Sequence, residues 1–146
     1  MRAFSLLSLL LLLPLTVHAE YLGDLSENEL NADSIFNDIG AYGPLSPTSP
    51  RNSIGLYGSP VSPYSATNPL AIDAPRLYDQ EGNYRGKLST NPLDPDSVSN
   101  PLGRYGSSVS PDSLNNPLGA GSPLNPSSPT NPYGRGWRIE GGQKSR

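Results

Sequence analysis

Apolar residues are crowded at the start of the chain and thinly spread over the rest. Residues 3–15 are mostly leucine and follow a single basic residue, Arg2. Val17 and Ala19 place small residues at the two positions that a signal peptidase reads. The pattern predicts a secretory signal peptide over residues 1–19 rather than a membrane anchor, because the apolar run is well short of the ~20 residues needed to cross a bilayer. No later segment has the composition of a membrane span.

Beyond the signal peptide, apolar and polar residues alternate in only two short stretches. Residues 76–88 carry apolar and aromatic side chains on both sides of a polar loop that contains Gly82, which predicts a β-hairpin. In residues 136–142, Trp137 and Ile139 alternate with polar neighbours, and this predicts a further strand beside the hairpin.

The remaining pattern fits neither a helix nor a strand, but it repeats. Residues 21–43 match residues 84–106 at twelve positions when the chain is shifted by 63 residues. The same shift places GSPVSPYSATNP over GSPLNPSSPTNP. One offset that holds at both ends indicates two related halves, roughly 21–72 and 84–139.

A shorter beat of 16 residues runs inside the second half, where residues 95–103 recur as residues 111–119. Ser110, Pro111 and Asp112 are typical of a helix start. The segment from Asn116 to Gly119, Asn-Pro-Leu-Gly, is typical of a type I turn. Each repeat is therefore predicted to contain one capped helical turn followed by one tight turn.

The predicted fold class is a mostly irregular, turn-rich repeat array with short one-turn helices, one β-hairpin at about 76–88 and a signal-peptide helix. Its predicted segments are the signal peptide at 1–19, a degenerate first repeat half at 20–75, the hairpin plus second repeat half at 76–139, and a flexible basic tail at 140–146. We expect the one or two apolar residues of each beat to share a thin core. These are Ile35, Ile39, Tyr42, Ile54, Tyr57, Leu70, Val98, Leu102, Tyr105, Val109, Leu114 and Leu118, joined by Tyr84. The alternative is a stiff, polyproline-like spacer in which the apolar residues stay solvated.

The phrases YRGKLS at 84–89, DPDSVSNPLG at 94–103, RYGS at 104–107 and NPYGRGWRI at 131–139 give the second half its character. They resemble a group of small exported bacterial proteins with tandem Asn-Pro-Tyr-Gly and Ser-Pro-Asp-Ser phrases. The resemblance is strong over 76–139 and decayed in the first half, and leucine replaces the usual tyrosine at Leu93, Leu102 and Leu118. It implies export, a shared architecture and a periplasmic or extracellular address, and it supplies no mechanism.

The composition excludes several kinds of catalytic and metal-binding site. The chain has no cysteine, and its one histidine, His18, lies in the signal peptide. The usual ligands of zinc, iron and copper and His-assisted nucleophiles are therefore missing after cleavage. A formal net charge of −3 disfavours nucleic acid as a partner. Asp94, Asp96 and Asn100 hint at a calcium module but break the EF-hand pattern, and helix capping is the competing role of Asp96.

These observations lead us to expect an exported, non-enzymatic repeat protein without a cofactor or metal, acting as a binding or structural component of the cell envelope or the extracellular space. The partner is unknown, and an envelope polymer or protein is the expected class. A largely disordered spacer rich in Pro, Gly and Ser is the alternative, and a calcium-binding module is the remote one. The candidate contact residues are Tyr64, Arg104, Tyr133, Arg135, Trp137 and Arg138; for Tyr64, Tyr133 and Trp137 a place in the core is equally compatible with the sequence.

Overall fold

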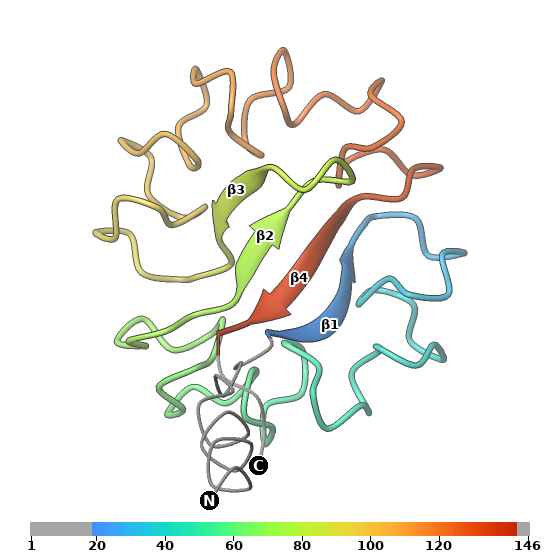
Figure 1. Ribbon diagram of the computed structural model, residues 1–146, viewed down its shortest axis with the longest axis vertical. Helices are drawn as coiled ribbons and strands as arrows, with labels where there is room; N and C mark the ends of the chain where they lie inside the picture. Colours follow the sequence, from blue (N-terminus) through green and yellow to red (C-terminus); the bar gives the residue numbers. More distant parts are fainter. Residues whose placement is uncertain (1–18, 143–146) are drawn as a thin grey trace, which may run out of the picture.

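The computed structural model describes residues 19–142, so the predicted signal peptide lies outside it up to His18. Four strands form a small antiparallel sheet in the order β1-β4-β2-β3 (Figure 1). Their bounds are Glu20–Leu25 for β1, Arg76–Tyr78 for β2, Tyr84–Lys87 for β3 and Trp137–Gly141 for β4. Over residues 19–142 the chain has no helix, and so none there that could cross a membrane.

Both predicted β segments are confirmed. β2 and β3 form the hairpin, with Tyr78 opposite Tyr84, and the Asp79 amide donates to the Asn83 carbonyl oxygen (2.9 Å) across its loop. β4 pairs with the other side of β2, where Leu77 faces Ile139. Because β4 runs through Gly141, the first two residues of the predicted basic tail belong to the sheet.

β1 completes the sheet and reveals an internal pseudo-two-fold relationship. It pairs with β4 as β3 pairs with β2, and the approximate axis passes beside the facing pair Leu77 and Ile139. With the halves taken as β1 to β2 (residues 20–78) and β3 to β4 (residues 84–141), the first strand of each half pairs with the last strand of the other half, which interlocks the two halves. Both outer edges are covered in the same way: the Asp24 amide donates to the Asp33 carbonyl, and the Lys87 amide to the Asp96 carbonyl, each at 2.7 Å. Covered edges protect a sheet from pairing with other chains.

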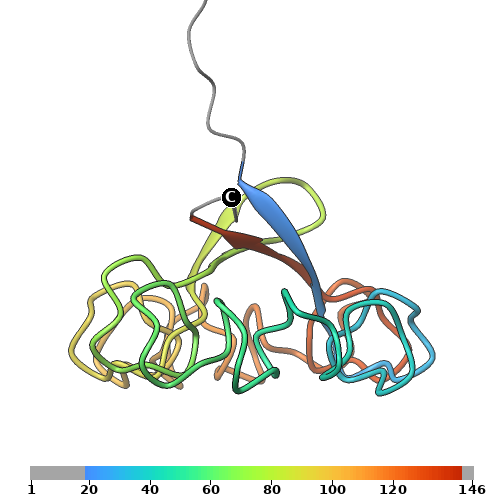
Figure 2. The same ribbon diagram turned by 90° about the horizontal axis from the view of Figure 1, so that it is seen from below.

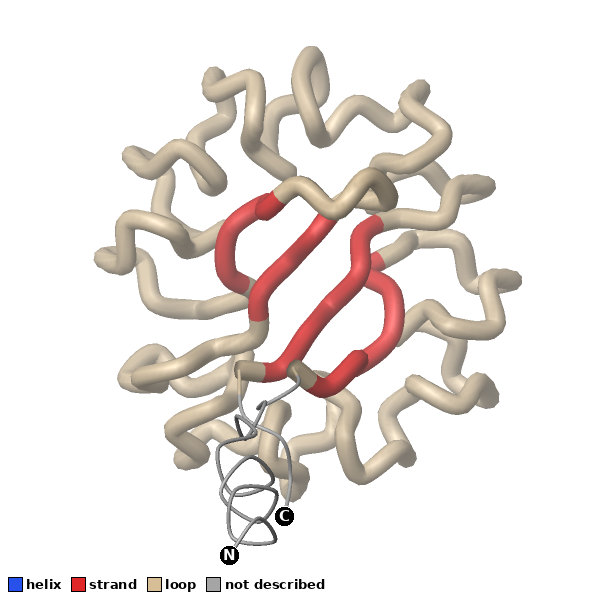
Figure 3. The backbone as a smooth tube through the Cα atoms, viewed as in Figure 1, coloured by secondary structure: helices blue, strands red, loops and turns tan. Residues whose placement is uncertain are grey.

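Residues 26–75 and 88–136 form turns and irregular loops, which we call the turn ring. The ring surrounds the sheet in Figure 3, and Figure 2 shows the sheet lying over it as a cap. From Asn28 to Gly58 every third amide donates to the carbonyl three residues earlier, in ten consecutive bonds. The ring closes where the Glu27 amide donates to the Pro129 carbonyl (2.8 Å).

The predicted one-turn helices are wrong, because turns take their place. The Ser113 amide donates to the Ser110 carbonyl (3.2 Å), as in one turn, and the Asn116 amide then donates to the Ser113 carbonyl (3.2 Å). The Ser110 and Ser113 hydroxyls each accept the amide two residues on. Side chains that bind nearby amides in this way compete with helix formation. The tight turn at Asn116 is present, with the Gly119 amide donating to the Asn116 carbonyl (3.1 Å).

Six Ser-x-x-Asn segments with a fully buried serine organise the ring, three in each half. The motif serines are fully buried, with 0 % exposure. Each motif asparagine donates its side-chain amide to the carbonyl six residues earlier and accepts, on Oδ1, the amide two residues later. The six pairs are Ser34 and Asn37, Ser49 and Asn52, Ser65 and Asn68, Ser97 and Asn100, Ser113 and Asn116, and Ser128 and Asn131.

The three-residue step also explains the 16-residue beat. Five steps span 15 residues, the spacing from Ser34 to Ser49. Where the beat is 16, one residue is inserted at a carbonyl that accepts two hydrogen bonds: the amides of Gly106 and Ser107 both donate to the Gly103 carbonyl. The repeat is therefore a chain of three-residue turns with one inserted residue, which is why its sequence shows neither the period of a helix nor that of a strand.

The core is thin, as expected, but its members differ from those predicted. It lies between the inner face of the sheet and the inner wall of the ring, around Leu22, Leu25, Ile35, Tyr57, Leu77, Trp137 and Ile139. Of the predicted members, Ile35, Tyr57 and Tyr105 are buried, and Tyr42, Val98 and Leu114 pack partly against the core. The placement of six others in the core is wrong, because they sit at the outer tips of turns: Ile39, Ile54, Leu70, Leu102, Val109 and Leu118. The placement of Tyr84 in the core is also wrong, because it lies half-buried on β3 against Tyr78 and Tyr105, outside the core cluster.

Candidate interaction surfaces

Each repeat of the turn ring places two large apolar side chains on the outside of the molecule. We call these twelve residues the rim tips. Their exposed fractions run from 84 % to 99 %. The first row consists of Leu30, Leu45, Val61, Leu93, Val109 and Leu124, and the second row of Ile39, Ile54, Leu70, Leu102, Leu118 and Tyr133.

Turn chemistry fixes each rim tip in place. A rim tip is the third residue of its turn, and in eleven of the twelve turns its amide is bound by the side chain of the first residue; in the turn of Leu45 the first residue is Gly43. At Leu118, for example, the amide donates to Asn116 Oδ1 (3.0 Å). Proline precedes the tip in eight of the twelve turns, as Pro117 does here, and its ring fixes φ at the second turn position. The backbone under the tips is therefore held, and the apolar side chains point away from it.

The spacing of the rim tips is regular. The two tips of a repeat are nine residues apart, or three turn steps, in all six repeats. Of the rim tips, only Tyr133 was predicted from the sequence as a contact residue, because recurrent apolar residues were expected to point inward. The signal was present in the chain, since a turn-forming Asn, Ser or Gly stands two residues before every tip.

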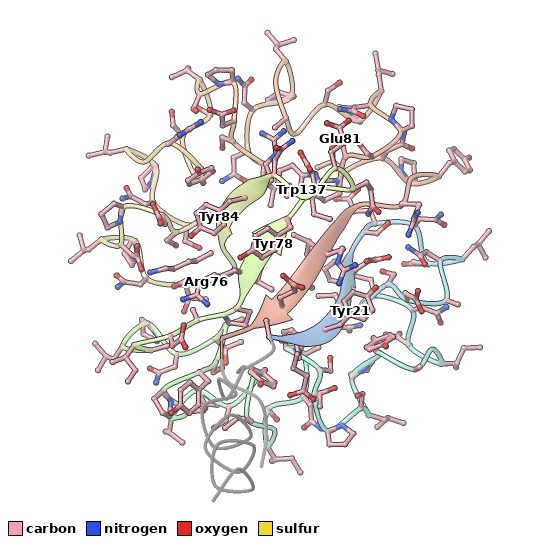
Figure 4. All side chains as sticks on the ribbon, viewed as in Figure 1. Tyr21, Arg76, Tyr78, Glu81, Tyr84 and Trp137 are labelled. Atoms are coloured by element: carbon pink, nitrogen blue, oxygen red, sulfur yellow. The ribbon has the colours of Figure 1, made fainter. Side chains whose placement is uncertain are left out.

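The outer face of the sheet is a second candidate surface, rich in tyrosine. Tyr84 packs edge-on against Tyr105 with ring centroids 5.4 Å apart, and Tyr78 lies 5.8 Å from Tyr84 on its other side. At the opposite edge Tyr21 packs against Tyr42 at 5.0 Å. Figure 4 shows Tyr21, Arg76, Tyr78 and Tyr84 over this face. An open groove of about 620 Å³ runs beside it, lined by Tyr78, Asp79, Gln80, Glu81, Gly82, Arg138 and Glu140.

The phenols of this face are fixed hydrogen-bond donors. Tyr21 donates to Asp24 Oδ1 (2.7 Å), and Tyr84 donates to Asp96 Oδ2 (3.0 Å). Burial, followed by the hydrogen bond to the carboxylate, raises the pKa of both phenols well above its ordinary value. A phenol with a raised pKa stays protonated at neutral pH, so these groups orient neighbouring side chains and are poor nucleophiles.

The structure places the six candidate contact residues in different parts of the molecule. Trp137 is 2 % exposed and belongs to the core, so its assignment to the contact surface is wrong: its position on the central strand directs the ring into the core, with Arg85 over the ring at 5.6 Å. Tyr64 is half-buried against the core. The other four are exposed, but on different parts of the molecule. Tyr133 is a rim tip, Arg104 pairs with Asp112, Arg135 follows the last turn, and Arg138 lies on the outer sheet face over Tyr21.

The residues that hinted at calcium serve the turn ring. Asp94 accepts the Asp96 amide on Oδ1 (2.9 Å) and the Lys87 ammonium on Oδ2 (3.0 Å). Asn100 donates to the Asp94 carbonyl (3.0 Å). Between residues 19 and 142 no group of three or more acidic, His or Cys residues is placed to hold a metal ion.

Comparison with protein-family models, with curated proteins and with solved structures finds no match for this chain. The resemblance to small exported bacterial proteins therefore stays a prediction from the motifs.

Proposed function

We propose that this chain is an exported, non-enzymatic repeat protein that acts as a binding or structural component of the cell envelope or extracellular space, and that the rim tips are its contact surface. The observation that carries the proposal is the exposure of twelve large apolar side chains at one recurring turn position. Single exposed apolar residues are common, but a whole set at one recurrent position is typical of an interaction surface.

The location of the tips supports a role in binding. A polar residue would satisfy the third position of these turns equally well, because the bond there joins only its backbone amide and the side chain of the first turn residue. Burying a side chain of this size in a partner contributes about 1.5–3 kcal/mol. Twelve such side chains contribute nothing to the core of the free protein, so a partner accounts for them best.

The chemistry of the chain supports a non-enzymatic role. The sequence after His18 offers neither histidine nor cysteine. Among the described acidic groups, Asp79 and Asp94 are held in salt bridges, with Arg85 (2.9 Å) and Lys87 (3.0 Å). Their pKa values lie below the ordinary value, because hydrogen bonds outweigh the raising effect of burial. Such groups are poor general bases at neutral pH.

A spacer has less support than a binding component. A spacer gains reach from repeats that extend the distance between its ends. In this chain β1 pairs with β4, with Glu20 opposite Gly141, so the two ends of the folded part lie together. Adding repeats to such a ring would widen it without separating the ends.

Co-sedimentation tests the proposal. Residues 20–146, at about 1 μM so that weak self-association does not contribute, are pelleted with purified peptidoglycan sacculi or with envelope membranes. The rim variant, with serine at all six second-row tips (Ile39→Ser, Ile54→Ser, Leu70→Ser, Leu102→Ser, Leu118→Ser and Tyr133→Ser), is compared with the sheet-face variant Tyr78→Ser/Arg138→Ser.

We expect the unmodified chain and the sheet-face variant to pellet with one of the two materials and the rim variant to remain in solution. Failure of the unmodified chain to pellet with either would contradict an envelope role. Loss of binding in the sheet-face variant alone would move the contact surface to the outer face of the sheet.

A further inference from the structure

The rim tips surround the molecule, and this limits what can cover them. The turn ring lies on all sides of the sheet in Figure 1 and is shallow in Figure 2, and its twelve tips, spread along the whole ring, are 84–99 % exposed. A flat partner such as a membrane or a polymer sheet touches one arc of a perimeter at a time. Several partners placed side by side are needed to cover all twelve tips.

The pseudo-two-fold relationship gives each half of the molecule an equivalent set of rim tips. Leu30 and Leu93, Ile39 and Leu102, and Val61 and Leu124 occupy equivalent places in the two halves at the offset of 63 residues. A contact made by one half is therefore also available on the other half. A surface present twice on one molecule builds open chains or layers instead of closing into a dimer.

We propose that the arcs of rim tips that a flat partner leaves uncovered bind further copies of this chain, and that copies associate edge to edge into open arrays. This inference rests on the proposed function, because it adds a second partner for the same surface. The rim tips themselves carry no charge, so apolar tips of two copies meet without like-charge repulsion at the tips. The covered strand edges leave the rim, rather than the sheet, as the surface through which copies meet.

The size of one edge contact predicts its strength. Burial of a side chain of this class removes roughly 60–120 Å² of apolar surface from water. Two neighbouring repeats bring about four tips to one contact, or roughly 240–480 Å² per copy. Stable interfaces bury about 800 Å² per partner. Each contact is therefore weak, and the array forms where the local concentration is high or where one copy meets several neighbours.

Sedimentation velocity on residues 20–146 from about 1 μM to about 1 mM, the range in which weak contacts dissociate, tests this inference. We expect the weight-average sedimentation coefficient to rise continuously without a plateau at the dimer, and to rise further in ammonium sulfate, which strengthens apolar burial.

Two variants sharpen the test. Serine at all six second-row tips (Ile39→Ser, Ile54→Ser, Leu70→Ser, Leu102→Ser, Leu118→Ser and Tyr133→Ser) is expected to abolish the rise. Serine at Leu102, Leu118 and Tyr133 alone leaves only the first half competent, so association is expected to stop at a dimer. Circular dichroism confirms that both variants keep the fold of the unmodified chain, and the sheet-face variant Tyr78→Ser/Arg138→Ser is expected to associate normally.

A discrete dimer plateau for the unmodified chain, a constant monomer up to about 1 mM, or unchanged association of the six-tip variant would each overturn the inference. The result is separable from envelope binding, which is measured where the chain is dilute. A monomeric chain that binds the envelope through its rim would end the self-assembly inference and leave the proposed function standing.

Discussion

Asp24 and Lys87 occupy equivalent positions in the two halves and carry opposite charges. Both lie on outer strands and form a bridge with the last residue of a facing turn in the same register, Ser34 for Asp24 and Ser97 for Lys87. Lys87 binds the Asp94 carboxylate (3.0 Å), whereas Asp24 accepts the Asn31 side-chain amide (3.2 Å). The two halves thus keep one backbone arrangement and satisfy it with different charges, a salt bridge in one and a buried carboxylate in the other.

The buried carboxylate of Asp24 predicts a pH effect on stability. Burial raises its pKa, and the hydrogen bonds from Tyr21 and Asn31 only partly offset this. The folded state therefore holds this proton more tightly than the unfolded state, so the contribution of Asp24 to stability is present at low pH and is lost as the pH rises through the raised pKa. The free energy of unfolding of Asp24→Asn minus that of the unmodified chain should increase from about pH 3 to about pH 7. Urea unfolding at each pH measures it.

Asp79→Asn serves as the opposite control in that series. The Asp79 carboxylate accepts bonds from the Asn83 and Glu81 amides and from Arg85, and these hold its pKa below the ordinary value despite burial. Its contribution is present above the ordinary pKa of Asp and is lost as the pH falls, so Asp79→Asn should lose relative stability as the pH rises. If both differences ran in the same direction, the environments assigned to the two carboxylates would be wrong.

The glycines of the outer strands predict a clash with the turn ring. Gly86 has a φ of 94°, and an added Cβ would lie 2.6 Å from both the Asp96 carbonyl oxygen and Tyr105 Cβ. Gly82 has a similar φ of 87°, but no heavy atom stands within 4 Å of its Cβ position. We expect Gly82→Ala to cost about 1–2 kcal/mol from φ alone, and Gly86→Ala to cost about 1–3 kcal/mol more from the clash. Equal losses in chemical denaturation would show that the strand and the ring are not in close contact.

The motif asparagines are expected to stabilise the ring through their side-chain amides. Asn116 donates Nδ2 to the Ser110 carbonyl (2.9 Å) and accepts the Leu118 amide on Oδ1. Asn116→Asp keeps the acceptor and removes the donor, so the Ser110 carbonyl keeps only the bond from the Ser113 amide, and the loss of one hydrogen bond should cost about 0.5–1.5 kcal/mol.

Asn91→Asp is the matched control, with the same change of charge. Within the described residues the Asn91 side chain makes one hydrogen bond, as acceptor of the Leu93 amide. Asn91→Asp is therefore expected to lower the free energy of unfolding by no more than about 0.5 kcal/mol. Thermal unfolding of the two variants side by side compares them, and a similar shift in both would assign the effect to charge.

Core and rim positions are expected to respond differently to truncation. Leu77 is fully buried at the centre of the sheet, and Leu77→Ala should lower the free energy of unfolding by about 2–5 kcal/mol. Leu102 is 93 % exposed, and Leu102→Ala should change it by no more than about 0.5 kcal/mol. Urea titrations of dilute protein measure both. A large loss at Leu102 would mean that the rim tips belong to the core after all.

The hairpin, the strand from Trp137 and the turn at Asn116 were all predictable, since each is determined by neighbours along the chain: alternation around a Gly-containing loop for the strands, and Asn-Pro-Leu-Gly for the turn. β1 was within reach as well, because the 63-residue offset places Tyr21, Gly23 and Leu25 over Tyr84, Gly86 and Leu88 of the predicted hairpin. The turns that replace the predicted one-turn helices were not predictable, because a helix and a chain of turns share the same Ser-Pro-Asp start. The next backbone hydrogen bond decides between them.

The sequence by itself determined the duplication, the three-residue turn chemistry and the absence of cysteine, because these depend on residue type and spacing alone. Only the tertiary structure decided which apolar residues are inside. Ile35 and Ile39 stand four residues apart in one repeat, yet one is 3 % and the other 99 % exposed. A chain of turns changes direction every third residue, so inside and outside follow from how the ring closes under the sheet, through contacts such as Ser26 with Gly134, 108 residues away.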